Sequence, residues 1–455
     1  MPAFWSAIAL LPDGWAQDVR LTVSDGRIVS VESGVAAAPG DAVHRITLPG
    51  LANVHSHAFQ RGMAGLAEHR GNAAGASSDD NFWSWREVMY RFLDRLTPND
   101  MEAIAALAYV EMLETGYTHV GEFHYLHNDP AGQPYADPAE MAARIAAAAN
   151  NTGIGLTLLP VFYAHSNFGG QAPNHGQRRF LHDLDSFARL LDACRPLLSD
   201  GDRLGIAPHS LRAVTSEELA ALIAMHPQGP IHIHAAEQQK EVQDSLAFSG
   251  KRPVEWLLEH AGLDARWCLI HATHLTDAET DALAASGAVA GLCPITEANL
   301  GDGIFPALRF LEAGGRIGTG TDSNVLIDPA QELRALEYSQ RLAHQARNVL
   351  ASDAHPSVAR RLFEAALAGG AQAMGIAPGL AAGHPADFVT LDPDHPALHG
   401  RSGDRLLDSW IFAARGPCID TVWKRGHQLV AGGRHKDSAA VTARYLKVID
   451  RIMAA

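Results

Sequence analysis

Short apolar runs recur through the middle of the chain, and stretches with helical spacing separate each run from the next. Such runs, bounded by turn residues, are typical of buried strands, and strands that alternate with helices are typical of a parallel sheet. The runs read LPGLANVHSH, THVGEF, GLTLLPVFYAH, RLGIAPHS, PIHIHAAE, CLIHATH, AVAGLCP and RIGTGTDS. Because eight such units suffice to close a barrel, we expect an α/β fold with a (β/α)₈ TIM barrel over residues 49–375.

The clearest helical stretch of the chain is TPNDMEAIAALAYVEMLETG. Thr97 suits the N-cap, Pro98 suits the first helical position and Gly116 suits the C-terminal stop. The sequence therefore predicts a helix between Thr97 and Gly116.

Both ends of the chain show a different pattern, in which apolar and polar residues alternate over short runs. In DVRLTVSDGRIVSVESG, Asp25 and Gly26 separate two alternating runs, which is a strong hairpin signal. Short alternating runs of apolar and polar residues occur again in ADFVTLDPDHPALHG and TVWKRGHQLVAGGRH. We expect residues 1–48 and 376–435 to form one small, β-sandwich-like domain, followed by a C-terminal helix over 436–455. Two unrelated edge hairpins are the alternative.

The composition is that of a globular protein: 455 residues, of which 47% are hydrophobic and 19% charged. No apolar run reaches the roughly 18 residues that a membrane span needs, and the N-terminus lacks the pattern of a signal peptide. The cysteines are scattered and form no Cys-x-x-Cys pair; they are Cys194, Cys268, Cys293 and Cys418. Reduced thiols of this kind are typical of the cytoplasm, where we expect the protein.

The net charge of −15 limits the classes of molecule that the protein can bind. It argues against nucleic acid and against an anionic membrane, and it means that an anionic substrate needs arginines in its pocket. A homodimer is compatible with the sequence, which leaves the oligomeric state open. The stretch GNAAGASSDDN, Gly71–Asn81, is expected to be a mobile loop over the barrel mouth.

Side chains that bind metals or move protons gather at the predicted carboxyl ends of the strands, where such barrels place their active sites. His55 and His57 lie two residues apart in the first strand, so both point to one face. A solvated face or a shared metal ion would explain this pair. The other polar residues at strand ends are Glu122, His124, His209, His234, Glu237, His271 and Asp322. Imidazole and carboxylate groups suit a catalytic divalent ion, zinc in particular.

These residues belong to motifs with a family resemblance. NVHSHAFQRGMAG, IHIHAAEQ, LIHATH and GTGTDS resemble the amidohydrolase superfamily, and within it the deaminases that act on C–N bonds outside peptides. FWSWREVMY, GEFHYLHNDP, RPVEWLLEH and GLCPITEANLGDGIFP resemble the formimidoylglutamate deiminases of histidine degradation. The resemblance extends over residues 48–341, and the β-rich flanks fit the small β-domain of the superfamily.

The resemblance implies a metal site and a catalytic group. His55, His57, His234 and Asp322 correspond to the metal ligands, and Glu237, His271 and Asp322 correspond to the catalytic residues. The ligand in HIHAAE is His234 rather than His232, because the ligand precedes the glutamate by three residues. Members with two metal ions carry a bridging lysine, and neither GLTLLPVFYAH nor RLGIAPHS contains one. We therefore expect one divalent ion, with zinc favoured.

The expected reaction is the hydrolysis of an amidine, N-formimidoyl-L-glutamate, to N-formyl-L-glutamate and ammonia. A zinc ion lowers the pKa of its bound water to about 7. Asp322 can then accept the water proton, and Glu237 can carry a proton to the departing nitrogen. His271 can hydrogen-bond the water or the charge that develops on the adduct.

A dicarboxylate substrate calls for arginines, which bind carboxylates with two parallel hydrogen bonds. Arg86 and Arg212 match the substrate-binding arginines of the family, and Gln60, Tyr125 and His209 match its polar substrate contacts. A solvated arginine on an amphipathic helix is the alternative for Arg86.

Two other functions share parts of this pattern. Another deaminase or ring hydrolase of the superfamily, acting on a nucleobase or an imidazolone, would have the same metal site but would not need Arg86 and Arg212. A zinc-stabilised binding protein without activity is the second alternative. Structural zinc sites are usually closed and rich in cysteine, whereas the candidate ligands here are histidine and aspartate beside a spare glutamate, which favours an enzyme.

Overall fold

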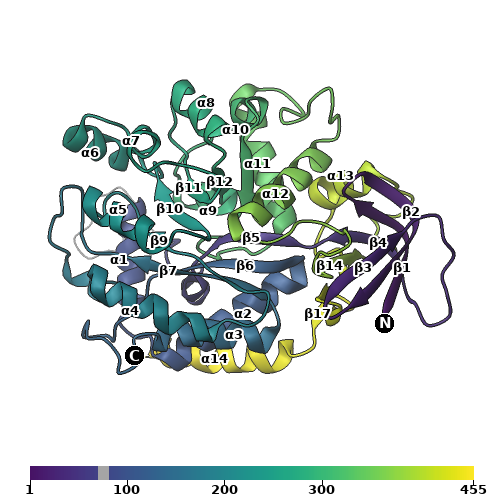
Figure 1. Cartoon of the computed structure of the whole chain (residues 1–455), viewed down its shortest axis with the longest axis horizontal. Helices are drawn as coiled ribbons and strands as arrows, with labels where there is room; N and C mark the ends of the chain where they lie inside the picture. Colours follow the sequence, from purple (N-terminus) through teal and green to yellow (C-terminus); the bar gives the residue numbers. More distant parts are fainter. Residues whose placement is uncertain (70–80, 455) are drawn as a thin grey trace.

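The computed structural model describes residues 1–69 and 81–454, so the predicted loop lies outside the described residues except for Asn81. Parallel strands occupy the middle of the molecule and helices surround them (Figure 1). One sheet has the order β5-β6-β7-β8, with β9 paired to β7, and the other has the order β10-β11-β12-β13. The bounds are β5 Leu51–Ser56, β6 Tyr117–His124, β7 Gly155–Phe162, β8 Arg203–Leu204, β9 Ala207–Pro208, β10 Ile231–Ala235, β11 Trp267–His271, β12 Val289–Leu292 and β13 Arg316–Thr319.

The two parallel sheets adjoin at both edges. Isolated parallel bridges join Ser56 with Asp322, Ile206 with Ile231, and Ser210 with His234. Gly320 allows the first of these contacts, because a Cβ atom at this position would lie 2.8 Å from the backbone nitrogen of His55. The glycine of the GTGTDS motif thus lets β5 and β13 approach, which brings their carboxyl ends together.

The fourth predicted strand is broken into two short pieces, β8 and β9. Gly205 lies between them and donates its N–H to the carbonyl oxygen of Leu158 at 2.9 Å. A Cβ atom at this glycine would lie 2.7 Å from the carbonyl oxygen of Pro230. Both pieces pair with β7, and Ile206 between them bridges to Ile231 of β10, so the fourth strand keeps its place although its regular pairing is interrupted.

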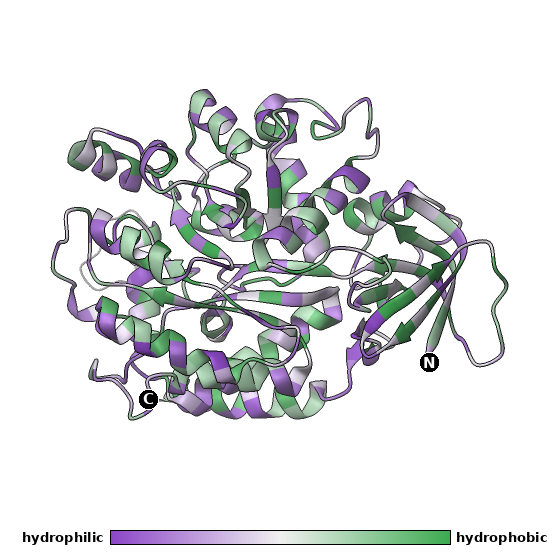
Figure 2. Cartoon of the chain, in the orientation of Figure 1, coloured by the Kyte–Doolittle hydropathy of each residue, from purple (hydrophilic) through white to green (hydrophobic). Residues whose placement is uncertain are grey.

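Helices cover the outside of the parallel strands. In α2, Pro98–Thr115, the hydroxyl of Thr97 accepts the N–H of Asp100, and Gly116 ends the helix at a φ of 108°, so the predicted caps are confirmed. Figure 2 shows that outer helices such as α4 and α14 mix hydrophilic and hydrophobic residues. The other helices in this part of the chain are η1 Ala58–Met63, α1 Phe82–Leu93, α3 Glu140–Thr152, η2 His175–Gln177, α4 Leu184–Cys194, η3 Arg195–Leu197, α5 Ser216–Met225, α6 Gln239–Ser249, α7 Pro253–His260, α8 Asp277–Ser286, α9 Pro294–Leu300, α10 Ala307–Glu312, α11 Pro329–His344 and α12 Val358–Met374.

The two chain ends meet in one eight-stranded sheet of order β17-β16-β15-β14-β4-β1-β2-β3, at the right of Figure 1. These strands form a single hydrogen-bonded sheet, in which β4 pairs parallel with β1 and antiparallel with β14. Asp25 and Gly26 have φ values of 50° and 75°, as the predicted two-residue hairpin requires. The bounds are β1 Ala3–Leu11, β2 Gly14–Ser24, β3 Arg27–Glu32, β4 Ala42–Pro49, β14 Phe388–Leu391, β15 Ile419–Lys424, β16 His427–Ala431 and β17 Arg434–His435.

The last two helices lie beyond the parallel sheets in sequence. They are α13, Asp404–Ala413, and α14, Ser438–Ala454. The second packs along α2 on the outer surface, at the bottom of Figure 1. Within residues 1–69 and 81–454, none of the helices combines the length and the apolar character that crossing a bilayer demands.

Candidate active site

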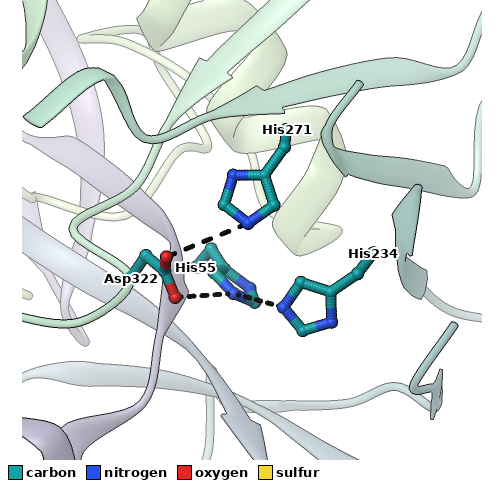
Figure 3. Close-up of side chains that lie close together, drawn as sticks. All are labelled: His55, His234, His271 and Asp322. Carbon is teal, nitrogen blue, oxygen red and sulfur yellow. Dashed lines mark hydrogen bonds and ion pairs between the residues drawn. The ribbon is translucent and has the colours of Figure 1, made fainter. Parts of the chain in front are cut away.

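Three histidines and one aspartate converge where the parallel strands end (Figure 3). Their ligand atoms, from His55, His234, His271 and Asp322, all lie within 4.8 Å of one another. The Nε2 atom of His55 lies 3.1 Å from Nε2 of His234 and 3.3 Å from Oδ1 of Asp322. All four side chains are buried. The cluster is therefore a compact set of nitrogen and oxygen donors in a site shielded from bulk water.

His57 adjoins this cluster. Its Nε2 atom lies 3.3 Å from Oδ1 of Asp322, and its ring centroid lies 4.6 Å from that of His55. It is not among the four residues whose ligand atoms all lie within 4.8 Å of one another. The structure thus brings together His55, His57, His234 and Asp322, and it adds His271 to the same group.

Backbone carbonyl groups orient two of the rings. Nδ1 of His57 lies 2.9 Å from the carbonyl oxygen of Phe123, and Nδ1 of His234 lies 3.0 Å from that of His209. Because a carbonyl oxygen only accepts, each Nδ1 carries the proton and each Nε2 presents a lone pair to the cluster. Nitrogen lone pairs facing a carboxylate are a donor set that fits a divalent cation.

The charges in the cluster agree with this interpretation. Burial lowers the pKa of the His55 imidazole to about 3, so the ring stays neutral, as a metal ligand must be. Burial alone would raise the pKa of Asp322, but the adjacent His55, His57 and His271 hold it below its usual value. Burial likewise lowers the pKa of His57 and His234, so these two rings and His55 are neutral imidazoles beside an ionised carboxylate.

Backbone strain accompanies these strand ends. His271 has a φ of 67° and Asp322 has a φ of 44°, and both are residues other than glycine in the left-handed region. Such conformations cost about 1–3 kcal/mol each and gather at functional sites. The surrounding structure must therefore hold both side chains firmly in their places.

Glu237 and His271 lie side by side next to the cluster. Oε1 of Glu237 is 3.7 Å from Nε2 of His271, and both side chains are buried. Burial raises the pKa of Glu237 to about 7, although His271 and Arg212 oppose the shift. Burial would lower the pKa of His271, but Glu237, Glu297 and Asp322 raise it to about 10. Glu237 is therefore poised to exchange a proton near neutral pH.

A pocket lies in front of the cluster, and it is lined by all the predicted ligand, catalytic and substrate-binding residues except His55, whereas the strand-end residues Glu122 and His124 do not line it. Gln60 comes from η1 and donates its Nε2 hydrogen to the Tyr125 hydroxyl at 2.9 Å. His209 follows β9 and lies with its Nδ1 atom 3.1 Å from the Ser210 hydroxyl. Residues predicted from separate, distant motifs of the sequence thus surround one space.

The two predicted substrate arginines line this pocket without an anionic partner. Among the residues that the structure describes, neither Arg86 nor Arg212 forms an ion pair, and the buried Nε atom of each has no hydrogen-bond partner. Arg86 lies on α1, with its guanidinium carbon 4.4 Å from the ring centroid of Trp83. Arg212 is 6% exposed, and although burial would lower its pKa, the nearby charges of Glu241 and Glu237 raise it. Neither carboxylate lies within ion-pair distance of Arg212 in the described structure.

Two residues with contacts in the site had no role in the sequence prediction. Glu297 belongs to the motif GLCPITEANLGDGIFP, and its Oε1 atom lies 3.2 Å from Nδ1 of His271. Tyr163 follows β7 directly and lines the pocket. Its place after a strand was the available signal, since that edge of the sheet carries the site. For Glu297 the sequence offered only the motif itself.

The chain matches known families over nearly its whole length. Residues 46–429 match the amidohydrolase family, and residues 1–45 match the family described as formimidoylglutamate deiminase HutF, N-terminal domain. A curated formimidoylglutamate deiminase from Pseudomonas aeruginosa is 49% identical over 457 residues, which cover 100% of both chains.

Solved structures agree with this assignment. The crystal structure of an amidohydrolase from Brucella melitensis has a TM-score of 0.95 and 54% identity, and 100% of both chains is covered. An adenosine deaminase from Xanthomonas campestris with bound zinc shares the fold, with a TM-score of 0.81, 24% identity, and coverage of 100% of this chain and 98% of that chain. The family matches and the 49% identity together show that this chain belongs to the amidohydrolase family, in its branch of formimidoylglutamate deiminases.

Proposed function

We propose that this chain hydrolyses N-formimidoyl-L-glutamate to N-formyl-L-glutamate and ammonia, as a step of histidine degradation. The observation that carries the proposal is one pocket that joins the histidine and aspartate cluster to two arginines that form no ion pair with any described residue. The cluster suits hydrolysis, and the arginines suit a substrate with two carboxylates. The name of the Pseudomonas aeruginosa relative supports this choice of substrate.

A single zinc ion is the proposed cofactor, with His55, His57, His234 and Asp322 as its ligands. The support is the donor set: imidazole nitrogens whose lone pairs face an ionised carboxylate, at a position with room for substrate in front. Such an ion, when bound, polarises the substrate and lowers the pKa of water to about 7.

The protein groups then manage the protons. Asp322 accepts a proton from the water whose oxygen adds to the amidine carbon. Glu237, in reach of the same space, delivers a proton to the nitrogen of the adduct, and the C–N bond breaks as ammonia leaves. His271 hydrogen-bonds the adduct while charge develops on it. The contacts that support these roles are those of Glu237 and Asp322 with His271, at 3.7 and 3.9 Å.

Arg86 and Arg212 bind the two substrate carboxylates in this proposal, and Gln60, Tyr125 and His209 supply the remaining polar contacts. A buried guanidinium without a partner is costly, and a carboxylate that binds it removes that cost. A nucleobase or an imidazolone would leave Arg212 unpaired in its buried position. The small dicarboxylate is therefore the better fit.

The proposal includes the architecture around the site. The bridges at both sheet edges support a single (β/α)₈ barrel over residues 49–375. The shared sheet supports a small β-domain made of 1–48 and 376–435, with a helix over 436–455 beyond it. All four cysteines are buried and free, which supports a reducing compartment, the cytoplasm.

An ammonia-release screen tests the function. The purified protein is offered formimidoyl-L-glutamate, its aspartate homologue, adenosine, guanine and an imidazolone, each with and without a chelator. We expect rapid release from formimidoyl-L-glutamate and loss of that release after chelation. Faster release from a nucleobase or from the imidazolone would contradict the proposal in favour of another deaminase or ring hydrolase of the family.

A further inference from the structure

Tyr163 occupies the pocket wall beside the two arginines. It follows β7, is 4% exposed, and lines the same pocket as Arg86 and Arg212. Its ring packs edge-on against His209, with ring centroids 4.6 Å apart. The ring is therefore held in place by packing, and the position of its hydroxyl is fixed with it.

A buried glutamine determines the direction of the Tyr163 hydroxyl. Oε1 of Gln177 accepts the backbone N–H of Asn174 at 2.9 Å. Because a backbone N–H only donates, the other end of this amide must be the Nε2 group. That group donates to the Tyr163 hydroxyl at 2.7 Å, and Gln177 is completely buried. The hydroxyl oxygen is thus already an acceptor in this contact.

The proton of the hydroxyl is consequently free for another partner. Among the residues in the described part of the chain, the Tyr163 hydroxyl has no hydrogen bond other than the one from Gln177. Burial raises the pKa of Tyr163, and the positive charges of Arg212 and Arg86 act against this shift. The phenol therefore keeps its proton at neutral pH.

We propose that Tyr163 is a further substrate-binding residue, whose hydroxyl donates a hydrogen bond to a substrate carboxylate held by the arginines. Gln177 is a positioning residue. Its amide donates a hydrogen bond to the Tyr163 oxygen, so the hydroxyl proton is directed toward the pocket. The inference rests on the proposed function, since it takes the anionic end of the dicarboxylate as the ligand. The Tyr163 hydroxyl would give the pocket a neutral hydrogen-bond donor in addition to the two arginines.

Three substitutions test the two roles separately. Tyr163→Phe should lower kcat/KM for formimidoyl-L-glutamate roughly tenfold or more, mainly through KM, because a hydrogen bond to a charged acceptor is lost. Gln177→Glu should cause a similar loss although the hydroxyl remains, because a carboxylate can only accept and takes the tyrosine proton. Gln177→Met leaves that proton free, so it should retain more activity than Gln177→Glu.

The matched controls lie on the surface. Tyr338→Phe removes an exposed hydroxyl from α11, and Gln228→Glu adds the same charge in an exposed turn. Both should keep the wild-type kcat/KM within about threefold. The double variant Tyr163→Phe with Gln177→Glu should lose little more than either single variant, because both changes remove the same hydrogen bond.

Calorimetric titration with glutarate separates this inference from the proposed function. Glutarate carries the two carboxylates without the amidine, so its Kd should rise roughly tenfold in Tyr163→Phe whatever the reaction is. If Tyr163→Phe binds glutarate like the wild type and Gln177→Met is as impaired as Gln177→Glu, the inference is wrong and Gln177 is only a packing residue. If the Kd changes as expected but formimidoyl-L-glutamate releases no ammonia, the inference stands and the proposed reaction is wrong.

Discussion

The histidine and aspartate cluster and the two arginines of the pocket differ in how their side chains are held. The cluster side chains come from strand ends, and carbonyl groups at 2.9 and 3.0 Å orient His57 and His234. The arginines come from a helix and from the segment after β9, and the buried Nε atom of each has no partner in the described structure. Backbone contacts thus orient two rings of the first group before substrate arrives, whereas the second group keeps buried donors without partners in the described structure.

This difference separates chemistry from recognition. Groups that hold an ion and move protons must keep a fixed geometry, because small displacements are costly in catalysis. Groups that recognise an anion gain most when the free protein leaves them unpaired, because the ligand then satisfies a buried charge. Changes in the cluster should therefore abolish the reaction, and changes at the arginines should alter which substrate is accepted.

Removal of the metal should have the largest effect. We expect elemental analysis to find one divalent ion per chain, zinc in particular, and we expect dialysis against a chelator to abolish ammonia release. Zinc added back should restore it, because the ligand side chains are already oriented. Two ions for each chain, or full activity in metal-free protein, would contradict the single site on His55, His57, His234 and Asp322.

Glu237→Gln should have the next largest effect. The amide keeps the shape of the side chain but cannot transfer a proton, and general acid–base groups contribute roughly 10²–10⁴-fold to the rate. We expect kcat to fall by about this factor while the metal content and the thermal unfolding midpoint stay unchanged. Glu312→Gln, an exposed position in α10, is the matched control. A variant within about threefold of the wild type would mean that another group carries the proton.

The sequence could predict features that depend on neighbouring residues, but not those that depend on contacts between distant segments. We expected His55 and His57 to share a face because side chains alternate along a strand, and the resemblance to amidohydrolase motifs implied His234 and Asp322. The caps of α2 were equally local and are confirmed. The break of the fourth strand at Gly205 was not predicted, because it depends on the close approach of Pro230, a distant segment. The contact of Glu297 with His271 was missed for the same reason.

Arg86→Met and Arg212→Met should each cost less than loss of the proton carrier. A carboxylate left buried without its charged partner costs on the order of 2–5 kcal/mol. We therefore expect kcat/KM for formimidoyl-L-glutamate to fall roughly 30-fold or more, with unchanged metal content. Arg405→Met, an exposed position on α13, should have no effect and controls for the loss of a positive charge.

A truncated substrate sharpens this prediction. A formimino compound that lacks one carboxylate should be poor for the wild type, and the variant of the matching arginine should lose little further activity on it. If both arginine variants respond to the truncation as strongly as the wild type does, the arginines belong to the scaffold. The assignment would then fall back to an unspecified deaminase of the family.

Glu297 contacts the histidine and aspartate cluster, and its substitution should give the smallest loss of activity. It accepts the N–H of Cys293 at 2.8 Å, and it contacts His271. The backbone of His271 is strained, so contacts of its side chain must keep it in position. Glu297→Gln should lower kcat about tenfold with little change in KM, as expected when the partner of a site residue loses its charge. Glu332→Gln alters another buried carboxylate that holds α9, through Ile295, without touching His271. Equal losses of kcat in both variants would mean that only the packing of α9 matters.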